Sequence, residues 1–523
     1  MRTGRVGWRR ALAPGVALVG LWAGAGLRAQ VPPPGVAPAR ATDLIARREA
    51  ILRDERAGLA AAGVAPRPED APRADGATRF DPLPEVVNAA AIAPDPAVPP
   101  AARAARGAAA TALYDLAMAA SRAPDPPLAF IDECLRGALA RQVDHPEARR
   151  LLGFVPHGAG GWATPFAAQE LARGKVKDPT FGWVPADWVP HLARGELPAP
   201  QPSTRWLPAD EADAHRRDWK TPWRIETEHF VIFANVPLSG VIAFGGHFET
   251  FHQLFHALLA DVIGPELLPL ARRLKDPKLK PQLSSKKKHE VFYFATRDEY
   301  AARLAPLMGA DARKSLGIYF PRGKEFRDFG PRSYFFNDVG GQLDVTATLY
   351  HEVSHQLLFE SAGTTDYAKN PGNYWVFEGL GTYFETVQPQ ADGSVLVGGL
   401  VGPRIAQARR RLLDDGELIP IEAFVNMGRA VFNGRDDADA IYLHYTEAMA
   451  LAVFLMQNGE GRDREPFLDY ARDAYKGHLR GGHVWTLEAR LGRPYAEVER
   501  EFRAYLGRVA LPARPPAPAA TGP

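Results

Sequence analysis

Cysteine is almost absent from the chain, with one residue among 523. A lone cysteine cannot close an intramolecular disulfide, so a disulfide framework and a cysteine-rich zinc site are both excluded. Cys134 lies in a stretch, 130–139, whose apolar spacing predicts an amphipathic helix. We therefore expect a buried structural thiol there, with a nucleophilic thiol as the alternative.

An excess of charge of one sign is also missing, because 63 basic side chains face 61 acidic ones and leave a formal net charge of +2. Nucleic-acid-binding proteins usually carry a clear basic excess, so we expect no nucleic-acid partner. Beyond the N-terminus the chain has no apolar run of the ~20 residues that a membrane span requires, so no integral membrane domain is expected there. The length allows two or three domains with at least one sizeable core.

The N-terminal segment has the pattern of a secretory signal peptide. Four arginines precede a stretch of small apolar residues, 11–26, and the segment 27–29 offers a cleavage site before Gln30. The arginines are Arg2, Arg5, Arg9 and Arg10. We expect residues 1–29 to be removed and the protein to be secreted or to reside in the periplasm or cell envelope. Retention of the segment as an uncleaved anchor is the alternative.

Composition divides the following residues into further segments. Residues 30–105 are rich in Ala, Pro and Arg and predict a largely disordered linker, with a helical pattern only near 42–61. Residues 106–215 predict a small module of helices and tryptophans, and residues 509–523 a disordered tail. The tryptophans are Trp162, Trp183, Trp188 and Trp206. We expect them to pack a core, with carbohydrate binding as the alternative.

The segment 220–508 combines strand and helix patterns. Strands are predicted at 230–234 and 290–294, a hairpin at 317–320 and 333–336, and helices at 242–263 and 297–307. Beyond residue 345 the pattern is mainly helical. The sequence therefore predicts an α+β fold, with a separate helical, Trp-rich region on its N-terminal side.

The helix predicted around residue 350 carries the sequence His-Glu-Val-Ser-His. Val345, Leu349, Val353 and Leu357 recur every four residues and form its apolar face. His351 and His355 are also four apart, so both imidazoles project from one side of the helix and can share a metal ion. Glu352 lies beside them and can reach a metal-bound water without being a ligand.

A third ligand is available in Glu378, which follows His355 by 23 positions in a second predicted helix. Polar turn residues, 366–373, separate the two helices and allow the chain to reverse. Two histidines and one glutamate leave the fourth position of a tetrahedral zinc ion open for water, as in catalytic sites. The alternative for Glu378 is a helix cap or a pair with a surface arginine.

These two segments resemble the gluzincins, which are zinc peptidases with an H-E-x-x-H helix and a downstream glutamate ligand. Residues 375–385 are similar to the W-x-x-E-G-x-A-x-Y-x-E pattern of the aminopeptidase N family, with Gly381 in place of the usual Ala. The resemblance covers roughly residues 225–480 and is specific in these two segments alone.

The resemblance implies a zincin-like lobe with a small mixed β-sheet and the active-site helix, and a mostly helical C-terminal lobe. The peptidase domain would span 220–508 and hold one Zn²⁺ per chain through His351, His355 and Glu378. The implied reaction is hydrolysis of a peptide or protein substrate by a zinc-activated water, with Glu352 as the general base.

The resemblance also implies two supporting roles. Glu385, seven residues after Glu378, matches an acidic position that would accept a hydrogen bond from a ligand histidine; a solvent-exposed glutamate is the alternative. Tyr445 matches the tyrosine that stabilises the oxyanion of the tetrahedral intermediate, with Tyr442 and His444 as competitors.

In one segment the chain departs from the aminopeptidase pattern. The G-x-M-E-N motif that holds a substrate's free amino terminus is replaced by Gly-Gly-Gln-Leu-Asp at 340–344. Without that glutamate we expect an endopeptidase, or an enzyme with an unusual substrate preference, rather than an aminopeptidase.

Three other histidines lie in the helix predicted at 242–263. They are His247, His252 and His256, and Gln253 occupies the place where a base would stand. We therefore expect surface histidines on an amphipathic helix.

Two other functions stay open. One is a non-catalytic binding or scaffold protein on the same fold, with association to the cell envelope through the Trp-rich module. The other is a zinc hydrolase of a non-protein amide or ester. Whether residues 30–215 act as a propeptide also stays open.

Overall fold

The computed structural model describes residues 37–65, 73, 75–93, 95–158, 160–263, 268–283, 287–338, 345–361, 372–434, 437–476 and 486–511. The expected signal peptide, 1–29, and the segment 340–344 lie outside these ranges. Within them the protein is a mixed α+β structure, as the sequence predicts. None of the described helices is both long and apolar enough to cross a bilayer.

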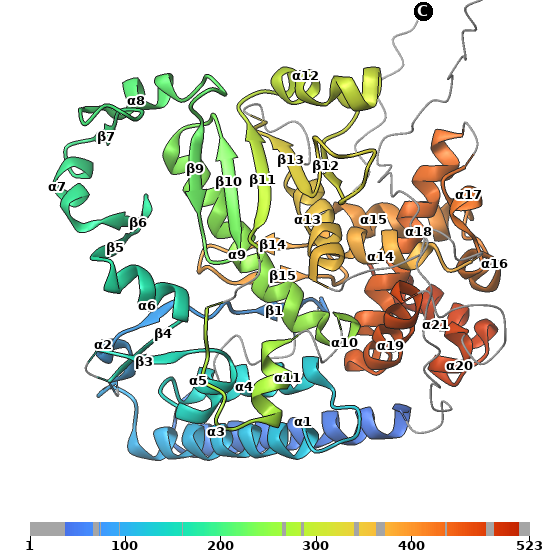
Figure 1. The fold of residues 1–523 in the computed structure, drawn as a ribbon. Coiled ribbons are helices and arrows are strands. Elements are labelled where there is room, and N and C mark those ends of the chain that lie inside the picture. The colour runs from blue at the N-terminus through green and yellow to red at the C-terminus, as the bar shows by residue number, and fades with distance from the viewer. Residues whose placement is uncertain are drawn as a thin grey trace, which may run out of the picture.

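A five-stranded sheet forms the centre of the molecule (Figure 1). Its strands are β9 (Trp223–Glu226), β10 (Phe230–Ala234), β11 (His289–Phe294), β12 (Gly317–Phe320) and β13 (Arg332–Phe336). They lie in the order β12-β13-β11-β10-β9. The inner pairs β10–β11 and β11–β13 are parallel, whereas β9 and β12 pair antiparallel at the two edges. The predicted strands and the predicted hairpin are confirmed, and the sheet is mixed.

Helices lie between the strands of this sheet and directly after its last strand. They are α9 (Leu238–Leu258), α10 (Ala260–Ile263), α11 (Pro269–Lys275), α12 (Arg297–Met308) and α13 (Val345–Ser361). A parallel pair needs such a crossover, and α9 to α11 supply it between β10 and β11. α9 buries Phe248, Phe251 and Phe255 in the core.

The helix α13 carries the His-Glu-Val-Ser-His sequence next to the edge of the sheet. Its apolar residues Leu349, Val353 and Leu357 are buried as predicted. Each buried aliphatic side chain contributes about 1.5–3 kcal/mol, so this face anchors the helix. Gln356 adds polar contacts, because its Oε1 accepts from Ser333 Oγ at 2.7 Å and its Nε2 donates to the Glu290 carbonyl at 3.2 Å.

The C-terminal part is mostly helical. Its elements are α14 (Trp375–Phe384), β14 (Gln388–Pro389), β15 (Val395–Val397), α15 (Pro403–Arg409), α16 (Ile421–Val425), α17 (Arg429–Phe432), α18 (Ala438–Gln457), α19 (Arg464–Tyr475), α20 (Leu487–Leu491) and α21 (Tyr495–Gly507). All ten residues of α14 are buried. A Cβ at Gly379 would lie 3.0 Å from the Ala448 carbonyl oxygen, so glycine lets α14 lie close against α18. Val509 is fully buried, so the expectation of a disordered tail is wrong at that residue, and residues 512–523 lie outside the described ranges.

The N-terminal part is folded wherever the structure describes it. Its helices are α1 (Ala37–Ala61), α2 (Ala89–Ile92), α3 (Pro100–Ala120), α4 (Leu128–Arg141), α5 (Pro146–Leu151), α6 (Pro165–Ala172), α7 (Val189–Leu192) and α8 (Ala209–His215). Its strands are β1 (Thr78–Phe80), β2 (Val86–Val87), β3 (Val155–His157), β4 (Gly161–Ala163), β5 (Lys175–Asp178), β6 (Gly182–Pro185), β7 (Glu196–Pro198) and β8 (Trp206–Pro208).

The expectation of a largely disordered linker at 30–105 is therefore wrong for its described residues. α1 packs along α3 at the base of the molecule (Figure 1), and β1 pairs with β15 far along the chain. Small residues allow this packing, since a Cβ at Gly58 would lie 2.9 Å from the Cβ of Ala105. Two Ala-rich helices can lie close together and bury a shared face without large apolar side chains. Composition alone does not reveal such packing.

The N-terminal region is also not separate, because one continuous core includes Leu44, Leu113 and residues as distant as Val509. The four tryptophans are half-buried and do not form its centre. Trp188 and Trp206 meet edge to face at 5.5 Å, and His191 stacks on Trp206 at 3.7 Å, beside the hairpins β5–β6 and β7–β8.

The lone cysteine is a core residue. Cys134 lies in α4 with 1% of its surface exposed, and burial raises the pKa of its thiol. A thiol that stays protonated is a poor nucleophile, so the structural interpretation holds.

Candidate metal centre

His351, His355 and Glu378 come together as the sequence predicts, although α13 and α14 are separate elements. The Nε2 atoms of the two histidines lie 3.1 Å apart. Glu378 Oε2 lies 3.5 Å from His351 Nε2 and 3.7 Å from His355 Nε2. A tetrahedral ion with bonds near 2.0–2.1 Å separates its ligand atoms by about 3.3 Å, so the three atoms are spaced to share one ion.

The surroundings of Glu378 fit a bound cation. Its Oε1 accepts a hydrogen bond from the Tyr374 hydroxyl at 2.8 Å. Its Oε2 is buried and accepts no hydrogen bond of good geometry from the described residues. A buried carboxylate oxygen without a partner is costly, and a metal ion between it and the two imidazoles would remove that cost. The residues therefore fit a metal ion.

The protonation of this cluster also favours a positive charge. Burial alone would lower the pKa of His351, but the carboxylates of Glu378 and Glu385 outweigh it and raise that pKa well above its ordinary value. Burial would raise the pKa of Glu378, and its contacts with His351 and His355 outweigh that and lower it. The buried carboxylates of Glu378 and Glu385 therefore stabilise a positive charge in this pocket.

Glu352 lies next to the three ligands with one oxygen already fixed. Its Oε2 accepts a hydrogen bond from the backbone N–H of Tyr319 in the edge strand β12, at 2.9 Å. Burial raises the pKa of the carboxyl, against the opposing effect of His351 and His355. A carboxylate with a raised pKa is suited to take up and return a proton near neutral pH.

Glu385 contacts the ligand histidine in the way that the sequence suggested. Its Oε1 lies 2.9 Å from His351 Nδ1, and its Oε2 forms an ion pair with Arg404 at 2.7 Å. A carboxylate at Nδ1 keeps the proton on that nitrogen and leaves Nε2 to face the ion. The solvent-exposed alternative is wrong, since only 10% of the Glu385 side chain is exposed.

Gly381 leaves room for the same imidazole. A Cβ at this position would lie 2.9 Å from Cε1 of His351 and 3.1 Å from its Nδ1. Any larger residue would have to push the ring away from Glu378 and Glu385. The departure from the aminopeptidase pattern at Gly381 therefore coincides with a close approach of α14 to the ligand.

The three candidates for an oxyanion donor have different partners in the structure. Tyr442 is exposed, and its hydroxyl donates to Gln407 Oε1 at 2.5 Å. His444 directs Nδ1 to the Phe432 carbonyl at 2.6 Å. Tyr445 is the one that interacts with Glu378 and Glu352: burial and then the Glu378 carboxylate raise the pKa of its hydroxyl well above the ordinary value.

Two groups at this centre were missed by sequence reasoning. The Tyr374 hydroxyl could have been found, because Tyr374 stands four residues before Glu378 at the start of the predicted helix. The Tyr319 N–H could not, because a backbone donor carries no side-chain signal and its strand meets Glu352 only in the folded sheet.

The expectation of surface histidines on α9 is right for His247 alone. His247 is exposed, whereas His252 and His256 are half-buried, with ring centroids 4.0 Å apart. His252 also stacks on His229, which precedes β10. The sequence pattern did not place His229 beside this helix.

Comparisons with known proteins give no family for this chain, since no protein-family model, no curated protein and no solved structure matches it. Its function therefore rests on the geometry of the site.

Proposed function

We propose that this protein is an exported, zinc-dependent metallopeptidase of the gluzincin type. The observation that carries the proposal is the arrangement of His351, His355 and Glu378, whose ligand atoms lie 3.1–3.7 Å apart. Glu352 lies beside this trio, on the same helix as His351 and His355, and its position supports a catalytic rather than a structural ion.

In this proposal each residue has a separate task. Zinc, when bound, supplies Lewis-acid polarisation and lowers the pKa of a ligated water toward ~7. Glu352 takes the proton of the attacking water and passes it to the leaving nitrogen. The Tyr445 hydroxyl, which is protonated at neutral pH as in an ordinary tyrosine, donates a hydrogen bond to the developing oxyanion.

The remaining residues position these groups. Tyr374 fixes one oxygen of Glu378 and leaves the other to the ion. Glu385, itself paired with Arg404, holds His351 in the tautomer that presents Nε2. The Tyr319 N–H holds Glu352 at the sheet edge. The zincin-like character of the β9–β13 lobe is part of the same proposal.

The substrate class follows from the sequence of the zinc-site segments and from the missing amino-terminus anchor. We propose a peptide or protein substrate cleaved internally. Hydrolysis of a non-protein amide or ester would use the same groups, so substrate panels have to include both.

The test compares metal dependence and activity in the same preparation of residues 30–523. Chelation should abolish casein hydrolysis, and added Zn²⁺ should restore it. His355→Ala should bind zinc poorly at this centre and stay inactive after zinc is added, whereas His247→Ala, an exposed histidine on α9, should behave as the wild type. Hydrolysis of ester or cell-wall peptide substrates alone would replace the peptidase assignment, and activity that survives His355→Ala would remove the metal-centre assignment.

A further inference from the structure

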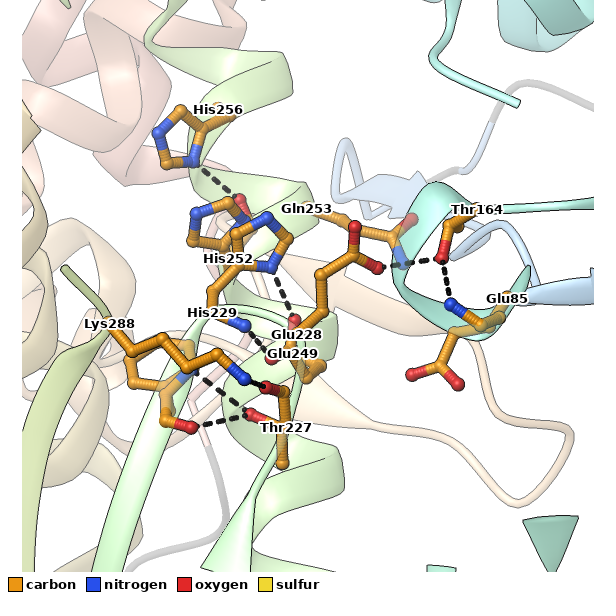
Figure 2. Close-up of polar contacts among 12 residues, drawn as sticks. Glu85, Thr164, Thr227, Glu228, His229, Glu249, His252, Gln253, His256 and Lys288 are labelled. Carbon is orange, nitrogen blue, oxygen red and sulfur yellow. Dashed lines mark hydrogen bonds and ion pairs between the residues drawn. The ribbon is translucent and has the colours of Figure 1, made fainter. Parts of the chain in front are cut away.

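A second group of metal-ligating side chains lies on another part of the fold (Figure 2). His229 stands in the turn between β9 and β10, and Glu249 and His252 lie on α9. Glu249 is held against His229 by two contacts: Oε1 accepts the backbone N–H of His229 at 2.7 Å, and Oε2 lies 2.7 Å from His229 Nδ1. These residues share no element with His351, His355 or Glu378.

The imidazoles in this region are unusually crowded. His229 and His252 stack with ring centroids 3.6 Å apart, and His252 lies 4.0 Å from His256 and 6.3 Å from His289.

The neighbouring histidines have the contacts that metal-binding histidines commonly show. His229 Nδ1 lies 2.7 Å from Glu249 Oε2, so an ion bound by both atoms would replace the proton between them. Around these ligands, His256 Nδ1 donates to the His252 carbonyl at 2.9 Å, and His289 Nδ1 lies 2.8 Å from Glu360 Oε2. Such partners fix the tautomer and orientation of an imidazole. The Glu228 carboxylate, which accepts from Thr164 Oγ1 at 3.0 Å, adds negative charge nearby (Figure 2).

We propose that His229, Glu249 and His252 form a second metal-binding site, which takes a borderline divalent transition-metal ion such as Zn²⁺. One donor atom from each residue lies within 4.8 Å of the other two. Two imidazoles and one carboxylate are ligands that suit zinc and its neighbours in the first transition series. The carboxylate balances part of the charge of the ion.

Binding requires one local adjustment. An ion lies in the plane of each imidazole that binds it, and the rings of His229 and His252 are almost parallel, with 15° between their planes. One ring must therefore turn about its Cβ–Cγ bond. His252 is the ring that turns, because Glu249 holds His229 at both its backbone and its Nδ1.

The site would act as a structural clip. An ion held by both segments ties the β9–β10 turn to the middle of α9, and so fixes the edge of the central sheet. An ion that binds the folded chain and not the unfolded one stabilises the fold by mass action. This role differs from that proposed for the ion near Glu352, and it does not depend on it.

The experiment counts Zn²⁺ ions per chain by equilibrium dialysis and elemental analysis, and uses a His351→Ala background to remove the first centre. We expect two ions in the wild type and one in His351→Ala. In the double variant with His252→Ala the remaining ion should bind at least about tenfold more weakly. His247→Ala in the same background is the matched control and should keep the ion, since His247 is exposed on the same helix.

A second readout separates loss of the site from loss of the fold. Zn²⁺ should raise the melting temperature of His351→Ala, and this rise should disappear in His351→Ala with Glu249→Gln while the far-ultraviolet circular dichroism stays unchanged. The proposal is wrong if His351→Ala binds no zinc, or if His252→Ala leaves the count and the thermal shift as they were. Failure of the peptidase test alone would leave this result untouched.

Discussion

The Nδ1 atom of His351 lies 2.9 Å from Oε1 of Glu385, at the C-terminal end of a different helix. This contact joins α13 to α14 on the side of the imidazole opposite the proposed ion. It also links the ligand to Arg404 through the second oxygen of Glu385. The ring of His351 is thus set by three groups: Glu385 at Nδ1, Glu378 near Nε2 and Gly381 against its edge.

Replacement of Glu385 by Gln should weaken zinc binding without removing a ligand. The neutral amide supports the imidazole less and leaves Arg404 without its ion-pair partner. Loss of such a supporting carboxylate typically costs about 10–100-fold in metal affinity or activity. Competition with a chromogenic chelator measures the affinity, and an affinity equal to that of the wild type would show that Glu385 does not support His351.

Replacement of Gly381 by Ala should displace the His351 ring. The added methyl would stand 2.9 Å from Cε1, closer than carbon atoms approach in folded proteins. We expect weaker zinc binding and lower kcat with little change in global stability. Gly507→Ala, at a position where a Cβ meets nothing within 4 Å, is the matched control. Full zinc affinity in Gly381→Ala would mean that α14 shifts to accommodate the methyl.

Replacement of Tyr445 by Phe should lower kcat and leave KM almost unchanged. The hydroxyl is proposed to donate in the transition state, and the loss of one such donor costs about 10²–10³ in rate. Tyr442→Phe is the control, because that hydroxyl is bound to Gln407 on the surface. Steady-state kinetics on one peptide decides between them, and an unchanged kcat in Tyr445→Phe would exclude it as the oxyanion donor.

The buried carboxyl of Glu447 should make the free energy of unfolding depend on pH, independently of catalysis. Burial raises its pKa to about 8, and among the described residues its Oε1 has no hydrogen-bond partner. Between about pH 4.3, the value for an unfolded glutamate, and pH 8, the folded chain keeps a proton that the unfolded chain releases. Stability therefore falls as pH rises through this interval, by about 1.4 kcal/mol per pH unit from this group.

Replacement of Glu447 by Gln should remove that contribution, because the amide oxygen can still accept from the Ile419 N–H and carries no charge. Urea unfolding should show the variant more stable than the wild type at pH 8.5 and similar to it at pH 5. Equal stability of the two proteins at both pH values would show that the carboxyl ionises freely in the fold.

Sequence reasoning located the candidate metal centre because its signals are local. The four-residue spacing of Val353 and Leu357 gave the helix and its buried face, and the same spacing put His351 and His355 on one side of it. Strand pattern gave four of the five strands of the central sheet for a similar reason, and it missed the edge strand β9. Glu378 was proposed from its place in a second predicted helix after a polar turn, and the resemblance supported that pairing of the two segments.

Contacts between segments that lie far apart in the sequence could not be predicted. The N-terminal segment pairs β1 with β15 and packs Gly58 against Ala105, and nothing in an Ala- and Pro-rich composition indicates such contacts. The cluster of His229 with His252 forms only after β10 and α9 pack together. The residue spacing within α9 alone therefore predicted an amphipathic helix with its histidines on the surface.

The central claim is that Glu352 acts as a base beside a metal held by His351, His355 and Glu378. The most direct measurement is casein hydrolysis and zinc content for Glu352→Gln, with Glu211→Gln at an exposed site as control. Gln preserves the size of the side chain and can still accept from the Tyr319 N–H. The account predicts the same zinc content as the wild type and activity lower by about 10²–10⁴-fold. Activity close to that of the wild type with zinc bound would contradict it.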